Sequence, residues 1–172
     1  DHSSILNFRS IGGVMDFYAF YAENAEDVIK AYHGVIGNAH LPPFWALGFQ
    51  QSSWQYNSTE RVDEVRQGYK DANLPLEVMW LDIEYMKDYK NFEVDTDRFE
   101  NLPGLSRRLH DDQQRLVTIV DAGFKLDKDY SYYTSANKTG LFIKSVQNPD
   151  KHNGNIIGRV WPGLSAFIDF MH

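Results

Sequence analysis

The chain has 172 residues, which is enough for one domain with a hydrophobic core of ordinary size. Its net charge of -7 and the absence of a basic stripe argue against a nucleic-acid partner, and no apolar run has the length of a membrane segment. There is no Cys, which excludes disulfides and thiolate metal sites.

The first forty residues predict two elements. Residues 15–21 are aromatic and partly alternating, which is typical of a strand, and they follow the turn signal Gly12-Gly13. A helix is expected next, capped by Asn24, with an apolar stripe on one face and an end near Gly37. The break at Pro42-Pro43 indicates the start of a new unit.

An alternation of strands and helices follows this break. Strands are predicted at 45–49, 76–81 and 116–120. Helices are predicted between them, one capped by Ser58 or Thr59 and one with Pro103 in its first turn. With right-handed crossovers this order gives a parallel sheet, and the spacing of the strands is that of a β/α barrel.

The remainder of the chain has a different composition. Residues 127–155 are mostly polar, which predicts a long loop or a small insertion after the third strand. Three parallel strands cannot close a barrel, so we expect the chain to be a piece of a larger protein.

Acidic and aromatic residues follow the predicted strands. Asp82 and Glu84 come after the second strand and Asp121 after the third, and Asp82 and Glu84 would share a face if their strand continued. Carboxylates in this place suit sugar binding, metal binding or acid–base work, and the alternative for each is to cap a turn. Trp54 and Trp161 suit stacking on a sugar, and the alternative is covering of the core. These patterns alone indicate a barrel piece with an acidic, aromatic, carbohydrate-facing end.

Several segments resemble, in order and spacing, glycoside hydrolase family 31, the α-glucosidase family. The similar segments are 12–18, 41–50, 54–56, 76–86, 92–99, 119–121 and 158–163.

The resemblance implies an α/β fold class: the N-terminal part of a (β/α)8 TIM barrel, incomplete in this chain and preceded by the tail of a β-sandwich domain. Residues 1–22 would end the sandwich domain, 23–40 would form a linking helix, and 41–172 would form the first part of the catalytic barrel, including the insertion.

The resemblance also implies a role for each site residue. The substrate-binding positions are Trp54, Asp82, Ile83, Ile119 and Trp161. Asp82 would accept hydrogen bonds from the hydroxyls of a terminal glucose, and the other four would form the apolar wall of its pocket. Asp121 is a possible supporting acid, while Glu84 would be structural.

The family's catalytic nucleophile and acid/base are aspartates in motifs that do not occur in this sequence, so no catalytic residue is expected in this chain. The expected partners are an α-linked oligosaccharide and the remainder of the same protein, or a companion chain, that carries the catalytic acids. No metal and no cofactor are expected.

The function implied is release of terminal α-linked glucose by a retaining mechanism with two carboxylates. The alternatives are a glycoprotein-trimming glucosidase, an α-xylosidase, an α-glucan lyase, or a carbohydrate-binding piece that is inert alone. The chain departs from the family's usual residues at Gln55, Ala122 and Phe124, which affects specificity beyond the first glucose. The sequons at Asn57 and Asn137 favour a secreted, lysosomal or endoplasmic reticulum location.

Overall fold

A computed structural model describes residues 4–172, which fall into two compact units, one up to Leu41 and one from Pro42 onward. The first three residues of the predicted segment 1–22 lie outside the described residues. The assignment of 1–22 and 23–40 to a sandwich domain and a linker stays a prediction.

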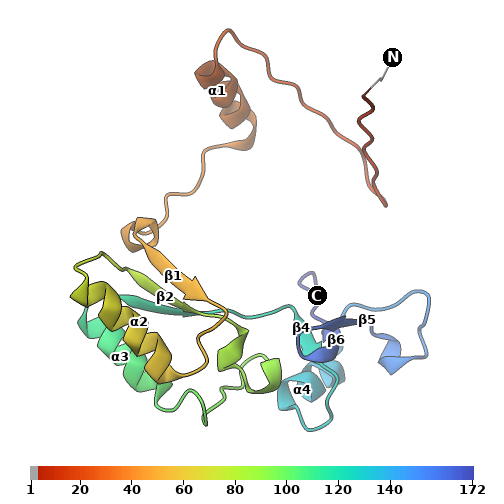
Figure 1. Ribbon diagram of the computed structural model, residues 1–172. Helices are drawn as coiled ribbons and strands as arrows, with labels where there is room; N and C mark the ends of the chain where they lie inside the picture. Colours follow the sequence, from red (N-terminus) through yellow and green to blue (C-terminus); the bar gives the residue numbers. More distant parts are fainter. Residues whose placement is uncertain (1–3) are drawn as a thin grey trace. The chain divides into compact units, whose positions relative to one another are not determined.

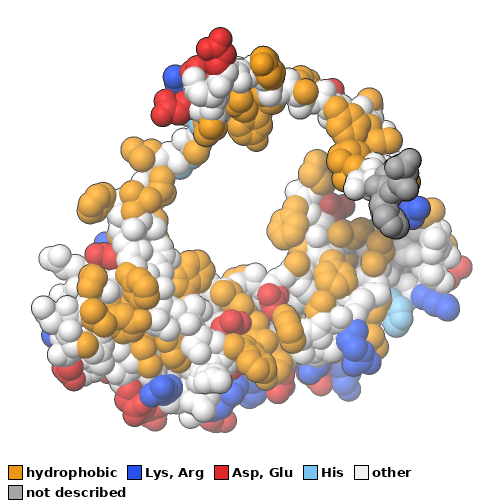
Figure 2. Space-filling model, turned by 45° about the horizontal axis from the view of Figure 1, so that its top comes forward, with side chains coloured by type: hydrophobic (Ala, Val, Ile, Leu, Met, Phe, Trp, Pro, Cys, Tyr) orange, Lys and Arg blue, Asp and Glu red, His pale blue; other side chains and the backbone are white. Residues whose placement is uncertain are grey.

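The first unit contains one helix, α1 (Ala25–Ile36), among its described residues. The side chain of Asn24 accepts a hydrogen bond from the backbone N–H of Asp27 at 3.0 Å, and Gly37 ends the helix with φ at 81°. The predicted cap and end are therefore confirmed. The helix buries none of its residues, and Figure 2 shows hydrophobic side chains exposed along this segment.

The predicted strand at 15–21 is wrong, because the structure assigns no strand to the described residues before Pro42. A strand needs a neighbour to pair its backbone N–H and C=O groups, and this unit supplies none in its described part. An alternating pattern indicates that the side chains suit a strand, but it does not indicate whether a second strand is present to pair with it.

The second unit contains a parallel sheet with the strand order β1-β2-β3. Its strands are β1 (Gln50–Ser53), β2 (Val78–Leu81) and β3 (Arg115–Thr118). The predicted second and third strands are confirmed, with β2 starting two residues later than expected and β3 ending two residues earlier.

Two helices cover one face of this sheet, α2 (Thr59–Asp71) and α3 (Leu102–Asp111) (Figure 1). Ser58 caps α2 by accepting from the N–H of Arg61, and Asn101 caps α3 by accepting from the N–H of Gly104. The sheet and helices bury a common core that includes Val62, Met79, Leu81, Phe99, Leu105 and Leu109. The predicted strand–helix order is thus confirmed from β1 to β3.

The predicted strand at 45–49 is wrong. A 3₁₀ helix, η1 (Phe44–Leu47), occupies this segment, and the N–H of Ala46 donates to the carbonyl of Pro43 at 2.9 Å. The fixed φ of Pro43 suits the start of a helical turn, so the strand begins only at Gln50.

The insertion after β3 is more ordered than the polar sequence predicted. It forms an antiparallel sheet with the order β4-β6-β5, made of β4 (Gly123–Lys125), β5 (Ile157–Val160) and β6 (Gly163–Phe167). Of the two alternatives for 127–155, the small insertion is confirmed and the long loop is not, because this segment contains α4 (Ser131–Thr139) and the 3₁₀ helix η4 (His152–Gly154). Ala136 of α4 packs into a second core with Phe124, Tyr130 and Phe142.

Within residues 4–172, no helix combines the length and the apolar character needed to cross a membrane.

Candidate functional site

The parallel strands deliver the candidate residues to one edge of the sheet. Trp54 follows β1 directly, Asp82 and Ile83 follow β2, and Ile119 and Asp121 follow β3. Because the strands are parallel, their carboxyl ends lie at the same edge, which is where α/β enzymes place their sites.

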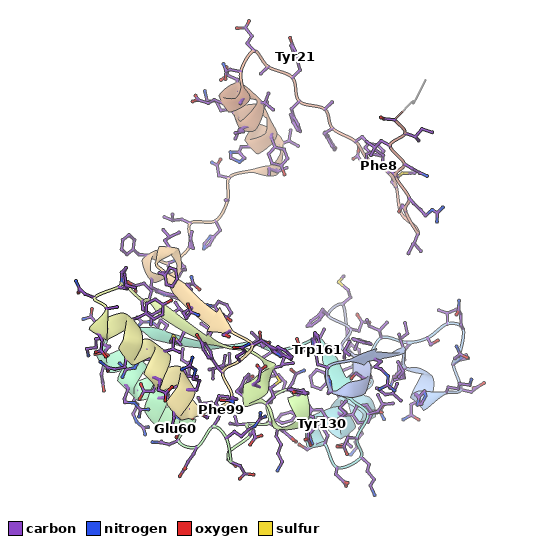
Figure 3. All side chains as sticks on the ribbon, in the orientation of Figure 1. Phe8, Tyr21, Glu60, Phe99, Tyr130 and Trp161 are labelled. Atoms are coloured by element: carbon purple, nitrogen blue, oxygen red, sulfur yellow. The ribbon has the colours of Figure 1, made fainter. Side chains whose placement is uncertain are left out.

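A hollow of 310 Å³ lies at this edge. It is lined by Trp54, Asp82, Ile83, Ile119, Asp121 and Trp161. The structure therefore brings together all five residues expected to bind substrate, with the supporting acid among them. Trp161 is distant in sequence from the other lining residues and lies in the turn between β5 and β6. Figure 3 shows it beyond the ends of the parallel strands. The volume lies near the lower end of the range for small-molecule sites, about 300–1,000 Å³.

Asp82 has a fixed orientation. Its Oδ1 accepts a hydrogen bond from the backbone N–H of Ile83 at 2.7 Å, at the start of the 3₁₀ helix η2 (Ile83–Tyr85). Within the described residues its Oδ2 has no such bond, so one carboxylate oxygen stays available to a hydroxyl donor in the hollow.

The apolar wall combines two exposed indoles with aliphatic side chains. Trp54 and Trp161 are 63% and 66% exposed, while Ile83 is buried beside Asp82. A large ring exposed next to a carboxylate suits a sugar, whose C–H faces are apolar and whose edges carry hydroxyls.

Asp121 lies in the same hollow and has an unpaired oxygen. Its Oδ2 is buried and, within the described residues, has no hydrogen-bond partner. Burial, followed by the charge of Asp82, raises the pKa of the Asp121 carboxyl. The two acids therefore differ, with Asp82 held by a backbone N–H and Asp121 desolvated.

Glu84 does not line the hollow. The expectation that it would share a face with Asp82 depended on a continued strand, but β2 ends at Leu81 and η2 turns the chain. Glu84 is buried within this turn, where its Oε2 lacks a partner among the described residues, and burial raises the pKa of its carboxyl.

Replacement of Glu84 by Gln is expected to change the pH dependence of stability. A raised pKa means that the folded chain keeps a proton that the unfolded chain has already lost, so the contribution of Glu84 to stability falls as pH rises through that interval. The free energy of unfolding of Glu84→Gln should therefore improve relative to the unsubstituted protein between about pH 4 and about pH 7. Urea unfolding at both pH values measures this difference, and a difference that stays constant contradicts it.

The two sequons lie in different surroundings. Asn57 is exposed, whereas Asn137 in α4 is half-buried and its Oδ1 accepts a hydrogen bond from Asn155 at 2.8 Å. Across the described part of the chain, no group of three His, Cys, Asp or Glu residues is arranged to hold a metal ion.

Sequence reasoning missed one residue that supports the site. The buried side chain of Asn91 forms hydrogen bonds with the backbone of Asp121. A single Asn in a loop has no periodicity or spacing that distinguishes it, so no local signal was available.

Comparisons with known proteins agree with this geometry. Residues 39–172 match the family described as glycosyl hydrolases family 31 TIM-barrel domain. Alpha-glucosidase 2 of Bacillus thermoamyloliquefaciens is 39% identical over 164 residues, which cover 95% of this chain and 20% of that protein. Lysosomal alpha-glucosidase of Mus musculus is 34% identical over 171 residues, which cover 98% of this chain and 17% of that protein.

Solved structures show the same relationship. The glucosidase II alpha subunit with alpha3-Glc2 bound is 31% identical, with a TM-score of 0.76 over 86% of this chain and 15% of that one. The chain thus spans a fifth or less of the length of these relatives. Because the family match covers most of the chain, the chain belongs to glycoside hydrolase family 31 and forms part of its TIM-barrel domain.

Proposed function

We propose that the chain supplies the glucose-binding pocket of an α-glucosidase that releases terminal α-linked glucose by retaining hydrolysis. The observation that carries the proposal is the convergence of Trp54, Asp82, Ile83, Ile119 and Trp161 on one hollow at the carboxyl ends of β1, β2 and β3. The relatives named above are α-glucosidases, which supports the same reaction.

In this proposal Asp82 selects and orients the sugar. The N–H of Ile83 holds one oxygen of the carboxylate, and the other accepts hydrogen bonds from hydroxyls of the terminal glucose. Trp54 and Trp161 cover apolar faces of the ring, which excludes water and fixes the sugar for reaction.

The two carboxylates that break the glycosidic bond come, in this proposal, from another part of the protein. One forms a covalent glycosyl intermediate, and the other first protonates the leaving oxygen and then activates water. The residues of this chain hold the substrate in place while these groups act.

The full-length protein tests the proposal. It is expected to release glucose from maltose and to cleave a nitrophenyl α-glucoside faster than the matching α-xyloside. No release of glucose contradicts the proposal. Faster turnover of the xyloside favours an α-xylosidase, and an unsaturated or anhydro sugar as product favours a lyase.

A glycoprotein-trimming enzyme is the second candidate, because several solved structures that resemble this chain are of glucosidase II. One of them is a complex of the catalytic subunit with the binding domain of a regulatory subunit. An ability to trim glucose from a glucosylated mannose oligosaccharide, with slow turnover of maltose, favours this candidate.

A location in the secretory pathway is proposed from the two sequons and from the lysosomal and endoplasmic reticulum relatives. The intact mass of the protein from its natural source, before and after enzymatic removal of N-glycans, tests this, with Asn57 the more accessible acceptor.

A further inference from the structure

Asn91 belongs to the connection after β2 and has no exposed surface. Its side chain contacts the link from β3 to β4. Its Nδ2 donates to the carbonyls of Asp121 at 2.7 Å and Gly123 at 3.2 Å. Its Oδ1 accepts from the N–H of Asp121 at 2.9 Å. One amide therefore pairs with both backbone groups of Asp121, as a neighbouring strand would.

The backbone of Asn91 is itself held in place. The hydroxyl of Tyr130, another fully buried side chain, donates to the carbonyl of Asn91 at 2.8 Å. The ammonium of Lys90 lies 5.5 Å from the centre of the Tyr130 ring and forms an ion pair with Glu93 at 3.1 Å. Figure 3 shows Tyr130 in the part of the insertion that contains α4. A buried, mutually bonded set of this kind has one preferred arrangement.

The hydrogen bonds of Asn91 and Tyr130 together form a clamp on the backbone of Asp121. This clamp acts on a part of the site that has no strand partner. β3 ends at Thr118, so Asp121 lies in the link that follows it. Its carboxyl lines the hollow together with Asp82, and its buried Oδ2 lacks a partner within the described residues. Among residues 4–172 no hydrogen bond directs that carboxyl, so its direction depends on the backbone that Asn91 holds.

We propose that Asn91 is a positioning residue for the sugar pocket, which fixes the backbone of Asp121 and thereby the placement of its carboxyl beside Asp82. The inference rests on the function proposed above. Asn91 is too deeply buried to contact a substrate, so it acts through the backbone that it holds, that of Asp121 above all.

Asn91→Asp in the full-length protein is the direct test, because Asp has nearly the same shape. The ionised carboxylate still accepts from the N–H of Asp121 but has no hydrogen for the carbonyls of Asp121 and Gly123. Protonated, it donates to one of them again. We expect kcat/KM for a nitrophenyl α-glucoside to fall on the order of 10- to 100-fold at neutral pH. The ratio of variant to unsubstituted enzyme should recover as pH falls.

Gln114→Glu is the matched control. The amide of Gln114 donates to the carbonyl of Leu76 at 3.1 Å, at the amino ends of the strands and away from the hollow. Its kcat/KM ratio to the unsubstituted enzyme should stay constant with pH, because a merely structural amide does not change the folded site. Hydrogen exchange of the peptide containing Asp121 should become faster at neutral pH in Asn91→Asp and stay unchanged in Gln114→Glu.

The outcomes separate the two proposals. An unsubstituted enzyme without α-glucosidase activity overturns the proposed function. An active enzyme whose Asn91→Asp variant has a pH profile parallel to its own overturns only the role of Asn91. If Asn91→Asp does not fold, Tyr130→Phe carries the test, since it removes one hydroxyl from the clamp. It should lower kcat/KM several-fold, and an unchanged kcat/KM overturns the role of Asn91.

Discussion

Asp82→Ala is expected to lower kcat/KM of the full-length protein for maltose on the order of 100- to 1,000-fold, or about 3–4 kcal/mol of transition-state binding. The carboxylate lies in the hollow with one oxygen held by the N–H of Ile83 at 2.7 Å. In the proposed pocket its removal leaves sugar hydroxyls without their charged acceptor, and a hydrogen bond to a charged group contributes more than one between neutral groups.

Two controls identify the cause of this loss. Asp82→Asn keeps an oxygen for the N–H of Ile83 but loses the charge, so its kcat/KM should fall less than that of Asp82→Ala. Asp97→Ala removes an acid that is exposed and outside the hollow, and its kcat/KM should equal that of the unsubstituted enzyme. An unchanged kcat/KM in Asp82→Ala shows that the pocket does not bind the reacting sugar.

Local sequence signals predicted the helices well and the strand boundaries less well. Asn24 and Ser58 cap α1 and α2 because a short polar side chain next to a helical pattern has one favourable use. The strand at 15–21 failed for lack of a partner, and the strand at 45–49 failed because Pro43 starts a helical turn. Whether a strand finds a pairing partner depends on segments distant in sequence, so local patterns do not predict it.

Helix α4 shows a different limit. Its sequence from Ser131 to Thr139 is rich in Tyr, Ser and Thr, which have modest helix propensity and no clear apolar stripe. The helix is stabilised by packing of Tyr133 and Ala136 against Phe142, a contact set by the insertion as a whole. Tertiary packing therefore decided this element.

The site was predicted in part from pattern and in part from the family resemblance. Parallel strands made it predictable that Asp82 and Asp121 would lie at one edge. Alternation could not separate Asp82 from Glu84, because the turn η2 begins directly after Asp82. The sequence pattern left Trp161 with two roles, sugar stacking or covering of the core, and only the resemblance assigned it to the pocket. It reaches the hollow through the pairing of β5 with β6, which no spacing near it indicates.

Phe99→Ala is expected to lower the free energy of unfolding of the barrel domain by about 3–5 kcal/mol. Phe99 is 1% exposed and packs in the core that the parallel sheet forms with helices α2 and α3; Figure 3 labels its position in the barrel part of the chain. Alanine leaves a cavity that the surrounding strands and helices can fill only by moving the elements that place Trp54 and Asp82. The substitution should therefore also lower the activity that remains at elevated temperature.

Phe92→Ala is the matched comparison, because this ring is 50% exposed, and the centre of the neighbouring Tyr132 ring lies 5.2 Å from its own. Its cost should be about 1 kcal/mol or less. Urea unfolding of the full-length protein, followed by tryptophan fluorescence, measures both variants. Equal costs contradict the placement of Phe99 in the core. A large cost for Phe99 alone confirms that this ring packs in the core that the sheet forms with its two helices.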